Sequence, residues 1–189
     1  MLRTSLLALA AVSLTAASVH AQPAPASGQP PGQAPGAPPR RPVDPRYAEA
    51  PRARAPSLAL AIEAATTAVE ACNKLNYHAT VQVTDAAGEI VVLLSGDGAG
   101  MRSLRLMKPK PFSVYRHKVA SSQALELAKT DTVLADAIKE DVGKGYGGAL
   151  PILVGDELIG VITVSGTPNG NLDESCGKAG LDKIASRLK

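Results

Sequence analysis

The sequence predicts an α+β fold in which an antiparallel sheet, built from two β-hairpins, is flanked by helices. Two observations predict the sheet, since each of two segments contains a pair of strand patterns separated by a short turn. A third observation predicts the flanking layers, because helical periodicity precedes, separates and follows the hairpins. Neither a nucleotide-binding loop nor an internal repeat beyond the hairpins is present in the sequence.

The first hairpin is predicted over residues 79–94. Residues 79–85 (ATVQVTD) alternate apolar and polar side chains, as a half-buried strand does, and residues 89–94 (EIVVLL) return as a second strand. Asp85 and Gly88 supply the residue types that such a turn favours. A helix is predicted before this hairpin, with Ser57 as its N-cap, and it runs to about Leu75.

The second hairpin is predicted over residues 149–165, where Gly155 and Asp156 form the turn between two apolar strands. Between the hairpins we expect a basic segment that ends in Pro109 and Pro111. The remaining expected elements are a glycine-rich loop over residues 95–100 and helices over residues 113–128, 131–140 and 173–188.

Residues 1–21 have the three parts of a secretory signal peptide: a positive start, an apolar stretch, and small residues at Val19 and Ala21 before a cleavage site. The apolar run is too short to span a bilayer, which takes about 20 residues. We therefore expect an exported protein, periplasmic or secreted, with no transmembrane segment after cleavage. Residues 22–56 hold 11 of the 15 prolines and are predicted to be a Pro/Ala-rich disordered linker before a domain at residues 57–189.

The charge distribution argues against a nucleic-acid partner. Residues 57–189 carry 14 basic and 15 acidic side chains, so the basic excess of the chain lies in its N-terminal part. A nucleic-acid-binding domain places its positive field on the folded part. With four Tyr, one Phe and no Trp, the chain also has few rings on which bases can stack.

Five segments together resemble the GlcG/HbpS-like haem-binding family. VQVTDAAGEI at residues 81–90 resembles the family hairpin VxVxDxxGxxV, and KVASSQA at 118–124 resembles its KAxTA helix. YGGALPI at 146–152 resembles the strand entry GGxPI, and GVITVSG at 160–166 followed by DESCGKAGL at 173–181 is similar to GxxGVSG…DExCxxxG. The resemblance spans about residues 57–189 and keeps the family's order.

The resemblance implies a profilin-like, three-layer sandwich that assembles into homo-oligomers. It implies haem as the cofactor, with a corrinoid or no cofactor as alternatives, because the family includes extracellular haem-binding proteins linked to redox sensing and a domain fused to a corrinoid adenosyltransferase. Our first hypothesis is therefore an exported, non-catalytic or redox-sensing haem-binding protein. A second is an accessory protein or small enzyme acting on a hydroxycarboxylate such as glycolate, and a third is an oligomeric scaffold without a small ligand.

Haem needs an axial ligand, an apolar slot, and cations or amides for its propionates. The mature chain would keep two histidines and lacks the Cys-x-x-Cys-His motif of covalent attachment. On the expected helix 113–128, His117 borders an apolar face that it shares with Ser121, Ala124 and Ala128, so His117 is our candidate iron ligand; a structural role is the alternative. Further candidates, each with packing as the alternative, are His78, Met101, Met107, Tyr115 and Tyr146.

Six basic side chains and no carboxylate fall within seventeen residues: Arg102, Arg105, Lys108, Lys110, Arg116 and Lys118. Such a run can neutralise propionates or another small anion, or it can be an ordinary solvated surface. Gly147 and Gly148 allow the backbone to approach a ligand or a subunit closely, or they only relieve steric strain. The candidate cofactor-binding residues are therefore Arg102, Arg105, Arg116, His117, Lys118, Gly147 and Gly148.

The remaining polar candidates have structural explanations. Asp173 and Glu174 begin the expected last helix, where free backbone N–H groups and the helix dipole stabilise carboxylates. Cys72 and Cys176 either form a disulfide, which export permits, or remain separate buried thiols. Because the sequence offers no nucleophile–base pair and few metal ligands, it favours a binding protein over an enzyme.

Overall fold

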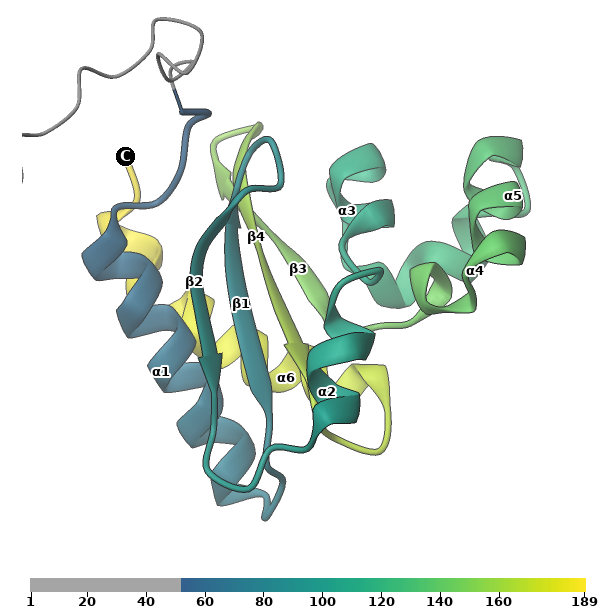
Figure 1. Cartoon of the computed structure of the whole chain (residues 1–189). Helices are drawn as coiled ribbons and strands as arrows, with labels where there is room; N and C mark the ends of the chain where they lie inside the picture. Colours follow the sequence, from purple (N-terminus) through teal and green to yellow (C-terminus); the bar gives the residue numbers. More distant parts are fainter. Residues whose placement is uncertain (1–51) are drawn as a thin grey trace, which may run out of the picture. The chain divides into compact units, whose positions relative to one another are not determined.

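The computed structural model describes residues 52–189, so the predicted signal peptide and the predicted linker up to residue 51 lie outside the described residues. The helices are α1 (Leu58–Lys74), α2 (Met101–Met107), α3 (Phe112–His117), α4 (Ala124–Leu127), α5 (Thr132–Glu140) and α6 (Gly170–Ile184). The strands are β1 (Thr80–Asp85), β2 (Ile90–Ser95), β3 (Ala149–Val154) and β4 (Glu157–Ser165). Helices lie on both faces of the sheet (Figure 1), which confirms the predicted α+β class.

The sheet is a four-stranded antiparallel sheet in the order β2-β1-β4-β3. Both predicted hairpins are present, and they are joined through β1 and β4, where Thr80 lies opposite Ser165 and Asp85 lies opposite Gly160. The first turn is closed by Asp85, whose Oδ1 accepts from the backbone N–H groups of Ala87 and Glu89 at 2.9 Å each. The turn chemistry expected from Asp85 is therefore observed.

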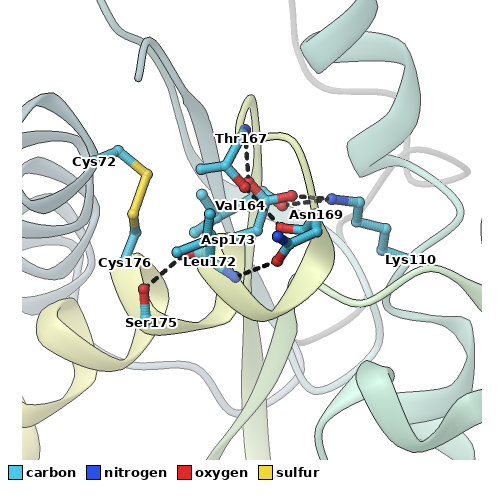
Figure 2. Close-up of a disulfide and its surroundings, with 9 residues drawn as sticks. All are labelled: Cys72, Lys110, Val164, Thr167, Asn169, Leu172, Asp173, Ser175 and Cys176. Atoms are coloured by element: carbon cyan, nitrogen blue, oxygen red, sulfur yellow. Dashed lines mark hydrogen bonds and ion pairs between the residues drawn. A yellow bond between two sulfur atoms is a disulfide. The ribbon is translucent and has the colours of Figure 1, made fainter. Parts of the chain in front are cut away.

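Helices α1 and α6 cover one face of the sheet and pack against each other (Figure 1). Small residues allow this close approach, since a Cβ at Gly180 would lie 2.3 Å from the carbonyl oxygen of Ala64. A disulfide joins Cys72 of α1 to Cys176 of α6, with Cα atoms 5.4 Å apart (Figure 2). Of the two alternatives left open by the sequence, the disulfide is the one observed.

The other face of the sheet is unusually polar, although it is buried. Val81 and Val83 of β1 face the α1/α6 core, so the alternating residues Thr80, Gln82 and Thr84 point toward α2 and α3. All six residues of β1 are buried, so the expectation of a half-buried strand is wrong. Helices α2 and α3 cover the second face, where hydroxyl pairs hold them: Thr80 with Ser103 at 2.8 Å, and Thr84 with Tyr115.

The segment between the hairpins departs most from the expected helices. Helix α2 occupies part of the expected basic segment, and the single helix expected over 113–128 is wrong. Helix α3 ends at His117 because Lys118 adopts a left-handed conformation (φ 55°) and its N–H bonds to the carbonyl of Val114. A 3₁₀ turn and the short α4 follow, so His117 shares no continuous helix face with Ser121 or Ala124.

Two further boundaries differ from expectation. Helix α6 begins at Gly170 instead of residue 173, since Asn169 is its N-cap and accepts from the N–H of Leu172 at 3.0 Å. At the N-terminal side, the last residues of the predicted linker contact the domain: the carbonyl of Arg54 accepts from the N–H of Ala86 at 2.9 Å. Within residues 52–189, no helix has the length and hydropathy that a membrane span requires.

Candidate functional site

A cavity of about 500 Å³ opens at the end of the sheet where β1 begins and β4 ends. Its walls come from His78 shortly before β1, from α2 and the turn after it, from the glycines before β3, and from the loop between β4 and α6. The volume lies within the usual range of small-molecule sites, about 300–1,000 Å³. The lining is mixed, with Leu106, Tyr146 and Pro168 beside charged and hydroxyl-bearing side chains.

A buried ion pair closes the inner end of this cavity. The Nζ of Lys110 donates to Oδ2 of Asp173 at 2.6 Å and to the carbonyl of Val164 at 2.9 Å. The other carboxylate oxygen of Asp173 accepts from the N–H of Thr167 at 3.0 Å, as Figure 2 shows. Each side chain of the pair is only 4% exposed. Burial lowers the pKa of Lys110 from its usual value, and the neighbouring carboxylates of Asp173 and Glu174 oppose this shift.

Glu174 joins two other segments below the cavity. Its carboxylate accepts from the N–H of Ser122 at 2.7 Å, from the hydroxyl of Ser122 at 2.8 Å, and from the N–H of Gly148 at 3.2 Å. Asp173 and Glu174 thus bind donors outside α6, whereas Asn169 caps the helix. The purely local explanation expected for these carboxylates is incomplete.

His117 lies outside the residues that line the cavity. Its Nε2 is 2.8 Å from Oδ2 of Asp131, which also binds the guanidinium of Arg116. Asp131 is the N-cap of α5 and accepts from the N–H groups of Val133 and Leu134. The hydrogen bond from Arg116 holds the pKa of Asp131 well below its usual range. Iron ligation by His117 stays a prediction.

The structure disperses the basic run. Arg102 lines the cavity, while Arg105 lies exposed on the same helix outside the lining. The ammonium of Lys118 donates to the carbonyl of Asp156 at 3.2 Å, away from the cavity. Of the basic run, Arg102 and Lys110 line the cavity, whereas Arg105, Arg116 and Lys118 lie outside its lining.

The two glycines before β3 accommodate close contacts within the chain. Gly147 lines the cavity, and a Cβ there would lie 3.1 Å from the Cα of Gly170. Gly148 has φ +126°, and a Cβ there would lie 2.5 Å from the carbonyl oxygen of Val164 and 2.6 Å from the Nζ of Lys110. These glycines let the strand entry pass against α6 and the buried lysine.

Two of the other predicted ligand candidates, His78 and Tyr146, line the cavity. Met107 is buried and Tyr115 bonds to Thr84, while Met101 is exposed outside the lining. Within residues 52–189, no group of three or more His, Cys, Asp or Glu side chains is placed to hold a metal ion.

A family model described as "Haem degrading protein HbpS-like" matches residues 57–182. The chain belongs to this family. The resemblance seen in the sequence is therefore confirmed. No match is found among curated proteins.

Solved structures agree with this assignment. The crystal structure of HbpS is 33% identical, covers 72% of this chain and 94% of its own, and has a TM-score of 0.60. A double mutant of Streptomyces reticuli HbpS is also 33% identical and has a TM-score of 0.60. The match covers 78% of this chain and 99% of the mutant. The PduOC protein in the PduOC:heme complex is 21% identical and has a TM-score of 0.60, and the match covers 71% of this chain and 97% of PduOC. This likeness shows the shared fold.

In this HbpS-like domain, the segments that carry the resemblance meet below the cavity. The N–H of Ala149 donates to the hydroxyl of Ser121 at 2.9 Å, and Glu174 binds both Ser122 and Gly148. Three motifs that are distant in the sequence are thus joined by one hydrogen-bond network. Sequence reasoning missed the Lys110–Asp173 pair, because its members are 63 residues apart and no local pattern links them.

Proposed function

We propose that this HbpS-like protein binds haem, or a closely related tetrapyrrole, in the cavity at the end of the sheet. The observation that carries this proposal is the combination of family membership with a cavity whose lining includes an imidazole, a phenol and a guanidinium: His78, Tyr146 and Arg102. These groups supply what haem requires, namely iron ligands and a cation for a propionate. The PduOC:heme complex supports the proposal further, since a protein of the same fold is seen in complex with haem.

His78 is the proposed axial ligand, because it is the histidine that lines the cavity. Haem, when bound, would supply the iron and its redox chemistry, and the side chains of the domain would bind and orient it. Leu106 and Pro168 provide apolar contacts for the macrocycle, and Arg102 provides charge for a propionate. Asp173 and Lys110 are bound to each other, which favours a binding role for them over proton transfer to a substrate.

Export forms part of the proposal. The predicted signal peptide supports it, and so does the disulfide between Cys72 and Cys176, because disulfides persist mainly in oxidising compartments such as the periplasm. Homo-oligomeric assembly is proposed as well. It is supported by exposed apolar side chains on the edge strand β2, where Ile90 is 51% and Leu93 is 43% exposed.

Titration of the purified apoprotein with haemin tests the function. We expect a saturable change of the Soret band at micromolar protein, and we expect His78→Ala to shift or abolish that band. His117→Ala serves as the comparison, since His117 is bound to Asp131 outside the cavity and its replacement should leave the band unchanged.

The outcomes separate three cases. No saturable change with the unmodified protein contradicts haem binding altogether. If His117→Ala loses the band while His78→Ala keeps it, haem binds at α3 and the cavity is not its site. If only Tyr146→Phe changes the band, the phenolate is the ligand and the assignment of His78 is wrong.

A further inference from the structure

We propose that the inner end of the cavity is a carboxylate-binding subsite, formed by Lys110, Arg102 and the N-terminus of α6. The subsite follows from the geometry of the cavity and takes the carboxylate of either of two sources: a haem propionate or a free small acid. The first source rests on the proposed function, and it implies that haem enters with one propionate pointing inward. The second source is independent of haem.

Lys110 is a fixed donor at the cavity wall. It is 3% exposed, it lines the cavity, and its ammonium is held by the carbonyl of Val164 and the carboxylate of Asp173. A lysine ammonium has three N–H donors, and these two acceptors use two of them. The third N–H has no acceptor among the described residues, and the ammonium is held in place by partners in two elements, β4 and α6.

Arg102 supplies the uncompensated charge. Its side chain lines the cavity and forms no ion pair with any residue of the described part of the chain. The charge of Lys110 is balanced by Asp173, and Glu174 is bound to Ser122 and Gly148. The charges of Arg102, Lys110 and Asp173 therefore leave the lining with one positive charge in excess, and it favours an anion.

The start of α6 adds a third favourable group. Asn169 and Gly170, the N-cap and first residue of this 15-residue helix, both line the cavity. The cap Asn169 takes the N–H of Leu172, while the other first N–H groups of a helix lack partners within the helix and the helix dipole places partial positive charge there. A carboxylate in this part of the cavity would lie near this terminus, Lys110 and Arg102, and the negative charge of Asp173 beside it is balanced by Lys110.

A comparison of haemin with haemin dimethyl ester tests the subsite, because the ester keeps the macrocycle and iron but has no carboxylate. We compare Arg102→Gln with Arg105→Gln, because both arginines are exposed on the same helix and Arg102 lines the cavity while Arg105 does not. Arg102→Gln should weaken haemin binding by about tenfold or more, the loss typical of one charge-assisted hydrogen bond, and should leave ester binding unchanged. Arg105→Gln should alter neither.

To test the contribution of Lys110 to carboxylate binding, both charges of its ion pair have to be removed together. Lys110→Met alone leaves Asp173 buried and unpaired, which is strongly destabilising. The double variant Lys110→Met/Asp173→Asn removes both charges, and circular dichroism checks its fold. It should also weaken haemin binding without weakening ester binding. Equal effects of each variant on haemin and on the ester would overturn the subsite, while haem binding itself would stand.

A second arm uses sodium propionate and sodium glycolate at millimolar concentration, with the shift in melting temperature as the readout. We expect a rise for the unmodified protein and for Arg105→Gln, and none for Arg102→Gln. If haemin does not bind but this pattern appears, the proposed haem function fails and the subsite serves a free small acid. Identical responses of all three proteins, together with equal haemin and ester affinities, contradict the subsite for both sources.

Discussion

At the scale of single residues, three carboxylates join segments that no shared helix or strand connects. Asp131 links α3 to α5 by binding Arg116 and His117 while capping α5. Asp173 holds the turn after α2 against α6 through Lys110, and Glu174 holds the entry of β3. Each carboxylate accepts several hydrogen bonds, so its replacement should loosen the segment that it holds.

Asp131→Asn isolates the charge of one of these links. Asparagine is as good an N-cap as aspartate, so the bonds to Val133 and Leu134 can persist while the charged pairing with Arg116 is lost. Folding lowers the pKa of Asp131, so its charge stabilises the folded state fully at pH values above the usual aspartate pKa of about 4. This contribution is lost as the pH falls below that value. We expect the variant to be less stable than the unmodified protein at pH 7 and the gap to narrow below about pH 4.

Thermal unfolding of both proteins between pH 2 and pH 7 measures this gap. Asp136→Asn is the matched control, since Asp136 lies on the same helix in an exposed pair with Lys139, and such surface pairs contribute little. A gap that stays constant, or that widens in acid, would contradict the assigned role of Asp131.

At the scale of elements, α1 and α6 form a layer held both by packing and by a covalent link. The disulfide joins residues 104 apart in the sequence, so the loop that it closes contains all four strands and the helices on the other face of the sheet. A link over a loop of this length restricts the unfolded chain strongly, by about 4–5 kcal/mol in the chain-entropy model. The stability of the α1/α6 layer thus depends on a disulfide, and disulfides form in an oxidising environment.

Removing the disulfide with Cys72→Ala/Cys176→Ala should lower the free energy of unfolding by about 2–5 kcal/mol, as measured in urea. Dithiothreitol should lower the free energy of unfolding of the unmodified protein to about that of the double variant, and it should leave the double variant's own value unchanged. Free thiols in the untreated protein, counted by thiol titration, would show that the bond does not form in solution.

Sequence periodicity predicted the elements whose pattern repeats, and it failed where elements are short. The hairpins and the two long helices have sustained periods and recognisable turns, so residues such as Asp85 and Ser57 were placed correctly. Between residues 101 and 128 the helices have only four to seven residues. One of them ends at Lys118 in a left-handed conformation, which the residue pattern does not predict. The ion pair of Lys110 with Asp173 in the cavity was not predicted either, because this pairing depends on the tertiary fold.

At the scale of the whole described domain, the cavity and the N-terminal attachment lie at opposite ends of β1. The cavity adjoins the start of β1, while residues 52–54 contact the turn that follows its end. Six residues of strand separate these ends by about 20 Å. Residues 52–54 thus contact the domain away from the proposed ligand site.

Two shortened chains test where the folded body begins. A chain starting at Ser57 loses the bond from Ala86 to the carbonyl of Arg54, the bond from Arg52 to the carbonyl of Ile90, and the ion pair of Arg54 with Glu157. It should be less stable in urea than a chain starting at Arg52 by about 1 kcal/mol, the net value of a hydrogen bond, since the exposed ion pair adds little. Both chains should bind haemin with equal affinity because the cavity lies at the other end. Equal urea midpoints would place the boundary at Ser57, and unequal affinities would show that the two ends are coupled.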